Sequence, residues 1–139
     1  MAFREKIAWA AFITTVIAWG GYFAVVVSQS GQTSHSAYLF WLFIAATGAQ
    51  AVLMAAAAII WSIRAPGEAN AKPDERDRAV AQRATGIAYL VIILALVGVI
   101  VWLHFGLHGR NTVFALIGVF MLAEAARFGA QAIGYRSAA

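Results

Sequence analysis

Three side chains of the last apolar segment have the chemistry for a site inside a membrane: Glu124, Arg127 and Gln131. They are three and four residues apart, so a helix places them along one stripe. Ionisable groups are costly in hydrocarbon, and a membrane-embedded acid is a typical proton carrier. The alternative is a self-neutralising pair, because Arg127 lies one turn from Glu124 and can extend toward the membrane surface. The spacing favours the pair. Gln50 of another helix is a candidate hydrogen-bond partner for this stripe, as a helix-to-helix contact rather than a ligand group.

The three histidines offer a second kind of chemistry. His104 and His108 are four residues apart, and His35 lies in a loop predicted on the same side of the membrane. Three imidazoles on one face are a candidate zinc or copper site, and two could contact a haem or a quinone headgroup. No carboxylate accompanies them to orient the ligands, so the favoured interpretation is ordinary interfacial histidine. We predict no cofactor.

A third candidate is the charged stretch "KPDERDR" at residues 72–78. Asp74 follows Pro73 and is predicted to cap a helix, with Asp77 three residues later as the capping-box acid and Glu75 favoured by the helix dipole. Three further roles remain open for these acids. They are docking of a basic protein partner, pairing with Arg64 or Arg136 to close the cytoplasmic end of the bundle, and cation binding. The predicted motif consists of Asp74, Glu75, Arg76, Asp77 and Arg78.

The composition decides which elements must position these residues. The chain has 139 residues, 63% of them apolar, and a mean hydropathy of +0.78, which is typical of a membrane protein. Four apolar runs reach the ~20 residues that a helix needs to cross the bilayer. The first run exceeds the ~7–15 apolar residues of a signal peptide and is expected to be a transmembrane helix. We predict a single all-α domain with helices at about 7–28, 38–63, 75–108 and 112–134.

The basic residues set the expected topology. Of the ten Lys and Arg residues, Arg110 alone falls on the second side if the chain crosses four times. Because basic loops are retained in the cytoplasm, both termini and the loop from Arg64 to Thr85 are expected there. The prediction is a multi-pass protein of the bacterial inner membrane, built from two antiparallel hairpins. Its positive charge faces lipid headgroups, so we predict no nucleic-acid partner.

Small residues predict how the helices pack, since close approach replaces the hydrophobic effect in lipid. Two helices carry such residues four positions apart, and a homo-oligomer through a remaining small face stays open. The expected packing positions are Ala45, Ala49, Ala51 and Ala55 in the second helix and Ala126, Ala130 and Gly134 in the fourth. The sequence has no cysteine and none of the common nucleotide, hydrolase or zinc-protease motifs, so we predict no enzyme.

The segments "PDERDR", "AEAARFGAQ" and the terminal "YR" together resemble a family of small, uncharacterised four-helix membrane proteins of bacteria and archaea. The resemblance covers about the second half of the chain. It implies that Asp74 to Asp77 form the family's D-E-R-D motif and that Glu124, Arg127, Tyr135 and Arg136 match its last helix. Some members are similar to proteins found beside small helix-turn-helix regulators. The expected function is therefore a non-enzymatic regulatory, sensory or accessory subunit, with a transporter or channel using Glu124 and a histidine site as alternatives.

Overall fold

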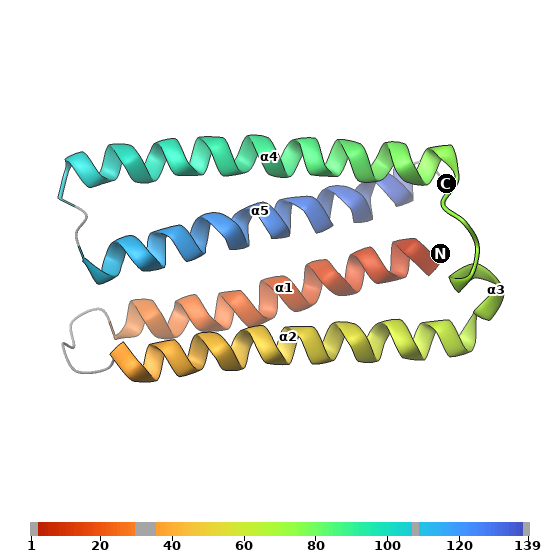
Figure 1. Cartoon of the computed structure of the whole chain (residues 1–139), viewed down its shortest axis with the longest axis horizontal. Coiled ribbons are helices and arrows are strands. Elements are labelled where there is room, and N and C mark those ends of the chain that lie inside the picture. Colours follow the sequence, from red (N-terminus) through yellow and green to blue (C-terminus); the bar gives the residue numbers. More distant parts are fainter. Residues whose placement is uncertain (1–2, 30–35, 107–108, 138–139) are drawn as a thin grey trace. The chain divides into compact units, whose positions relative to one another are not determined.

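The computed structural model describes residues 3–29, 36–106 and 109–137, and these residues form helices and no strands. The long helices are α1 (Phe3–Ser28), α2 (Ser36–Arg64), α4 (Glu75–His104) and α5 (Arg110–Ser137), with a single turn, α3 (Pro66–Ala69), between α2 and α4 (Figure 1). The all-α prediction is confirmed. Each long helix is long and apolar enough to cross a membrane.

Large apolar side chains cover the outside of these helices. Ile63 and Phe105 are 75% and 83% exposed, and similar side chains line α1, α2, α4 and α5. A soluble protein rarely exposes so much contiguous apolar surface. The surface fits a hydrocarbon solvent and is consistent with a multi-pass membrane protein.

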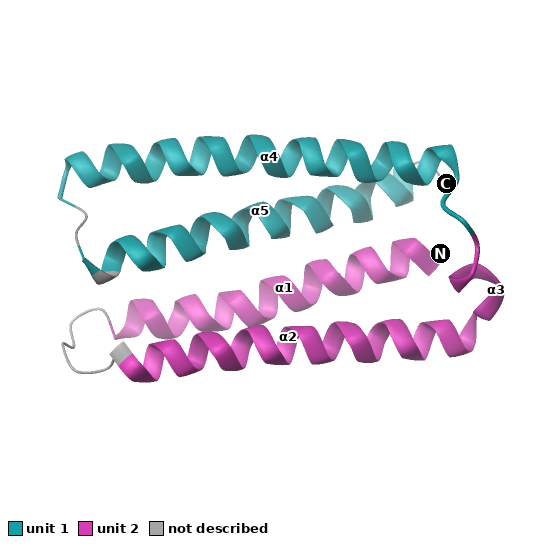
Figure 2. Ribbon diagram, in the orientation of Figure 1, with its two compact units in different colours: residues 1, 72–139 teal, residues 2–71 magenta. Residues whose placement is uncertain are grey.

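The chain divides into two compact units, residues 2–71 and residues 72–139 (Figure 2). In the first unit α1 packs against α2, and α3 packs against the end of α2. In the second unit α4 packs against α5. Each unit is therefore a pair of long helices, and each carries its own candidate residues.

In the first unit, α1 faces α2 through a polar and aromatic stripe. Thr15, Trp19 and Tyr22 are buried at helical spacing. The Trp19 ring lies 5.6 Å from the Phe43 ring of α2, centroid to centroid, and Tyr22 also contacts Phe43. Aromatic pairs at these distances add to the packing energy of the interface.

Within this unit, α2 does not pack against α1 through its expected small-residue face. Its four expected contact positions are all exposed, namely Ala45, Ala49, Ala51 and Ala55. The neighbouring face, with Phe43, Ala46 and Gln50, is half-buried instead. The reason is that α1 presents large aromatic rings and a hydrogen-bonding group to α2, so the contact uses the face that holds Gln50.

In the second unit, α4 and α5 approach each other through small side chains. Ala84 and Ala88 of α4 and Ala123 of α5 are buried, and Val99 packs with Val119 farther along the pair. A Cβ built at Gly134 of α5 would lie 2.8 Å from Cγ1 of Val80. This glycine therefore permits the close approach of the two helices, as expected for small residues in a membrane interface.

Both ends of α4 have local causes. At its start, Asp74 Oδ1 accepts from the Asp77 backbone N–H at 2.7 Å, and Asp77 Oδ2 accepts from the Asp74 backbone N–H at 3.3 Å. This is the reciprocal capping box that the sequence predicts. The helix ends at His104, before the predicted end at residue 108, because Gly106 takes a φ of 110° that a right-handed helix does not contain.

Candidate functional site

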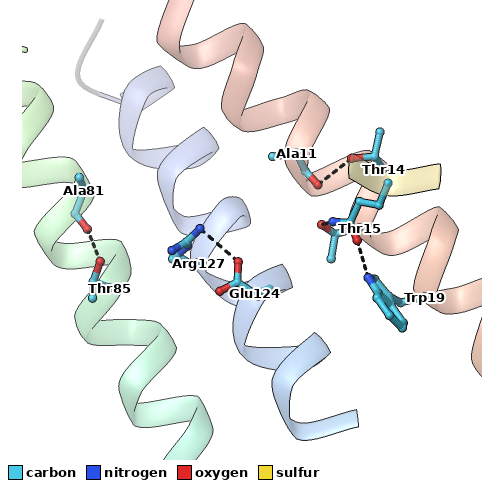
Figure 3. A network of polar contacts seen from close by, with 9 residues as sticks. Ala11, Thr14, Thr15, Trp19, Ala81, Thr85, Glu124 and Arg127 are labelled. Atoms are coloured by element: carbon cyan, nitrogen blue, oxygen red, sulfur yellow. Dashed lines mark hydrogen bonds and ion pairs between the residues drawn. The ribbon is translucent and has the colours of Figure 1, made fainter. Parts of the chain in front are cut away.

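Glu124 and Arg127 form an ion pair near the middle of α5. Arg127 Nη2 lies 3.1 Å from Glu124 Oε2, and both side chains are about 40% exposed, at 38% and 41% (Figure 3). The guanidinium also lies 4.7 Å from the centroid of the Phe128 ring, a cation–π distance. This geometry agrees with the ion pair that the spacing of the two residues predicts, in which one helix supplies both charges.

The pair leaves one polar atom unsatisfied. Arg127 Nε is buried and has no hydrogen-bond partner among the described residues. Gln131 lies one turn after Arg127 and is half-buried. The Glu124 carboxylate is therefore already in contact with a guanidinium, and its use as a proton carrier stays a prediction.

Gln50 finds hydrogen-bond partners within its own unit, and its predicted contact with the Glu124 stripe stays a prediction. Its side-chain oxygen accepts from the Trp19 indole N–H at 2.5 Å, and its amide nitrogen donates to the Thr15 hydroxyl at 2.7 Å. Both partners belong to α1. Gln50 thus satisfies two polar groups of a neighbouring helix, which is the helix-to-helix role that an amide takes in lipid.

Thr15 and Trp19 are site residues that the sequence reasoning missed. Thr15 is 1% exposed and Trp19 is 5% exposed, so their polar atoms need partners inside the protein. The available signal was their spacing of four residues, which puts a hydroxyl and an indole N–H on one face of an apolar helix. Adjacent Thr14 differs, since its hydroxyl donates to the carbonyls of Ala10 and Ala11 on its own helix. Figure 3 shows the contact with Ala11.

The first turn of α1 holds a second acid that the sequence reasoning missed. Glu5 is 5% exposed. One turn later, the indole nitrogen of Trp9 is buried without a hydrogen-bond partner among the described residues. Nearby, α3 and the following loop attach to the start of α1: Glu68 Oε2 accepts from the Phe3 backbone N–H at 2.9 Å, and Arg4 donates to the Ala71 carbonyl at 3.0 Å.

The histidine site falls largely outside the described residues, because His35 and His108 are not among them. Nδ1 of the exposed His104 lies 2.9 Å from the Ile100 carbonyl oxygen, one turn back on α4. Among residues 3–29, 36–106 and 109–137, no group of three His, Cys, Asp or Glu side chains converges as metal ligands do. The metal, haem and quinone interpretations stay predictions.

The charged residues at 74–78, called here the α4 start, fall into two groups. Asp74 and Asp77 close the capping box, and Glu75, Arg76 and Arg78 lie outside it as exposed side chains. Arg76 Nη2 also donates to the backbone carbonyl of Tyr135 at 3.3 Å, near the end of α5. The α4 start is therefore fixed both by its own cap and by a contact with the second helix of its unit.

Comparison with known proteins identifies no similar protein. The chain matches no protein-family model, and no curated protein and no solved structure is significantly similar to it.

Proposed function

We propose that this chain is a small, non-enzymatic subunit of the bacterial inner membrane, with a regulatory, sensory or accessory role, which docks a protein partner through the α4 start. The proposal keeps two antiparallel hairpins with both termini in the cytoplasm, because the basic residues favour that orientation. The resemblance to the D-E-R-D family of four-helix membrane proteins supports the same class of function.

One observation carries the proposal. The capping box fixes the backbone of the α4 start, and the contact of Arg76 with the Tyr135 carbonyl ties it to α5. Glu75 and Arg78 then stand exposed on a rigid support. A preorganised charged surface docks a partner at a lower entropic cost than a flexible loop does.

The experiment separates docking from folding by leaving the cap intact. A photo-crosslinking amino acid replaces Arg78 in cells that make the full chain, with and without Glu75→Lys. We expect one protein adduct of fixed mass at position 78, and at least tenfold less of it with Glu75→Lys, because charge complementarity governs association. The matched probe at lipid-facing Leu94, which is 62% exposed, should not give this adduct.

Two results would refute docking at this surface. One is an adduct at position 78 that Glu75→Lys leaves unchanged. The other is the same adduct from position 94, because that position lies on the apolar span of α4. Asp74 and Asp77 are avoided as test positions, since their loss would weaken the helix start itself.

A further inference from the structure

Two arginines share one exposed face of α4. Arg76 and Arg83 are seven residues apart, close to two full turns, so their side chains leave the helix in nearly the same direction. The separation along the axis is about 10 Å, and each arginine side chain is long and flexible enough to bend toward the interval between them. Both are exposed.

The same face continues as an apolar track. Ile87, Leu90 and Leu94 follow Arg83 at spacings of four, three and four residues and are 46%, 57% and 62% exposed. From Arg83 to Leu94 the helix rises about 16 Å, which is close to half of the ~30 Å hydrocarbon core. One helix face is therefore cationic at Arg76 and Arg83 and then apolar over about the depth of one lipid leaflet.

The end of α5 carries a third arginine, one residue after the point where Arg76 contacts α5. Arg76 donates to the Tyr135 carbonyl, and the exposed Arg136 is the next residue along α5. The guanidinium of Arg76 carries five N–H donors, so this one bond leaves others for an anion. The close contact of Gly134 with Val80 holds the two helix ends together at this level.

The acids of the α4 start lie off this face. Glu75 and Asp77 are neighbours of Arg76 in the chain, and each is turned about 100° from it around the helix. Asp74 and Asp77 are directed into the capping box. An anion is therefore favoured in the interval between Arg76 and Arg83, one turn inside the helix, rather than at the helix start.

We propose that this face binds an anionic phospholipid. The phosphate lies between the guanidinium groups of Arg76 and Arg83, with Arg136 near it, and an acyl chain lies along Ile87, Leu90 and Leu94. Arginine favours phosphate because its planar donors bind two oxygens at once. A lipid with a net negative charge is preferred to a zwitterionic one. The positively charged amine of a zwitterionic headgroup lies next to its phosphate and is repelled by the arginines.

The test compares lipids added to the purified full chain in a neutral detergent, with unfolding followed by circular dichroism. Dioleoyl phosphatidylglycerol should raise the unfolding temperature, and dioleoyl phosphatidylcholine should raise it much less. In Arg76→Gln/Arg83→Gln the apparent affinity for phosphatidylglycerol should fall at least tenfold. The matched control Arg78→Gln removes a charge two residues from Arg76, on another side of the helix, and should bind as the unmodified chain does.

Further arms identify the ligand. Inorganic phosphate at the same concentration should give no shift, and dihexanoyl phosphatidylglycerol should bind more weakly than the dioleoyl form because its short chains cover less of the track. Equal shifts from the two dioleoyl lipids would overturn the proposal. So would an equal loss of affinity in Arg78→Gln, or a shift with phosphate as large as with lipid.

Two further points complete the test: a control for folding, and the independence of lipid binding from partner docking. The double variant should keep the helical spectrum of the unmodified chain, and Arg76→Lys/Arg83→Lys should regain part of the affinity, because charge returns without the planar donors. A lysine variant no tighter than the glutamine variant would contradict the proposal. Arg83 takes no part in docking, and the docking test changes Glu75 and Arg78, so each proposal can fail without the other.

Discussion

At the scale of single residues, polar groups in the two units are satisfied in different ways. Glu124 and Arg127 neutralise each other within one helix, at 3.1 Å. Gln50 instead joins two helices by accepting from Trp19 and donating to Thr15. The first arrangement follows from sequence spacing, whereas the second needs a partner that spacing along one helix does not identify.

The adjacent threonines of α1 provide a matched test of the Gln50 contacts. We expect Thr15→Val to destabilise the protein by about 1 kcal/mol, because the Gln50 amide then loses an acceptor in a dry interface. Thr14→Val should change stability much less, since Thr14 bonds to carbonyls of its own helix. Unfolding in detergent, followed by circular dichroism, measures both. In a Gln50→Leu background Thr15→Val should cost little more, and an undiminished cost there would argue against this hydrogen bond.

The ion pair of α5 predicts strong coupling between its two charges. Either Glu124→Gln or Arg127→Gln should destabilise the protein, by up to about 3 kcal/mol, because one charge is left unpaired near the middle of an apolar helix. The double variant should recover most of the loss. A double-mutant cycle of unfolding free energies measures the coupling. Additive single effects would contradict a self-neutralising pair and would favour separate roles, such as proton carriage by Glu124.

At the scale of helices, α4 is the element whose course the sequence best predicts. Its start at Glu75 follows from Pro73 and the reciprocal contacts of Asp74 and Asp77, which are all within four residues. Its end was predicted less well, because an apolar run through Leu107 conceals the break at Gly106. A capping box can be predicted from the sequence, because its residues are neighbours in the chain. A helix end inside an apolar run is harder to predict.

A close approach of α4 and α5 occurs at Gly134. Gly134→Ala should destabilise the α4–α5 pair by about 1–3 kcal/mol, because the new Cβ would lie 2.8 Å from Cγ1 of Val80, a β-branched and therefore stiff side chain. Gly98→Ala is the matched control, since a Cβ there meets nothing within 4 Å. Unfolding free energies in detergent compare the two, and Val80→Ala should rescue the first. Equal effects at the two glycines would show that the approach is not tight.

At the scale of the whole molecule, the four apolar helices and the bias of basic residues lead to one expected orientation. The helices themselves are long and apolar enough to cross a membrane. The charge bias adds the prediction that residues 64–85 face the cytoplasm and that the turn before α5 faces the opposite side.

The absence of cysteine from the sequence makes this orientation simple to test. Asn70→Cys and Asn111→Cys each introduce one thiol at an exposed position. In intact cells, a membrane-impermeant maleimide should label position 111, and position 70 should react after the membrane is permeabilised. The reverse pattern would place the termini outside the cytoplasm, and equal labelling of both in intact cells would argue against four crossings.

The sequence by itself determined the class of the protein, the four apolar helices, the capped start of α4 and the Glu124–Arg127 spacing. These features depend on composition or on contacts within one turn of helix, so no distant partner is needed to predict them. The tertiary structure decided which faces meet. In lipid, apolarity does not mark the packing face, so Ala45 and Ala49 looked as suitable as the face that holds Gln50. The contacts of Gln50 with α1 and of Gly134 with Val80 link residues far apart in the chain. Hydrogen bonding selects the first, and the absence of a side chain at Gly134 permits the second.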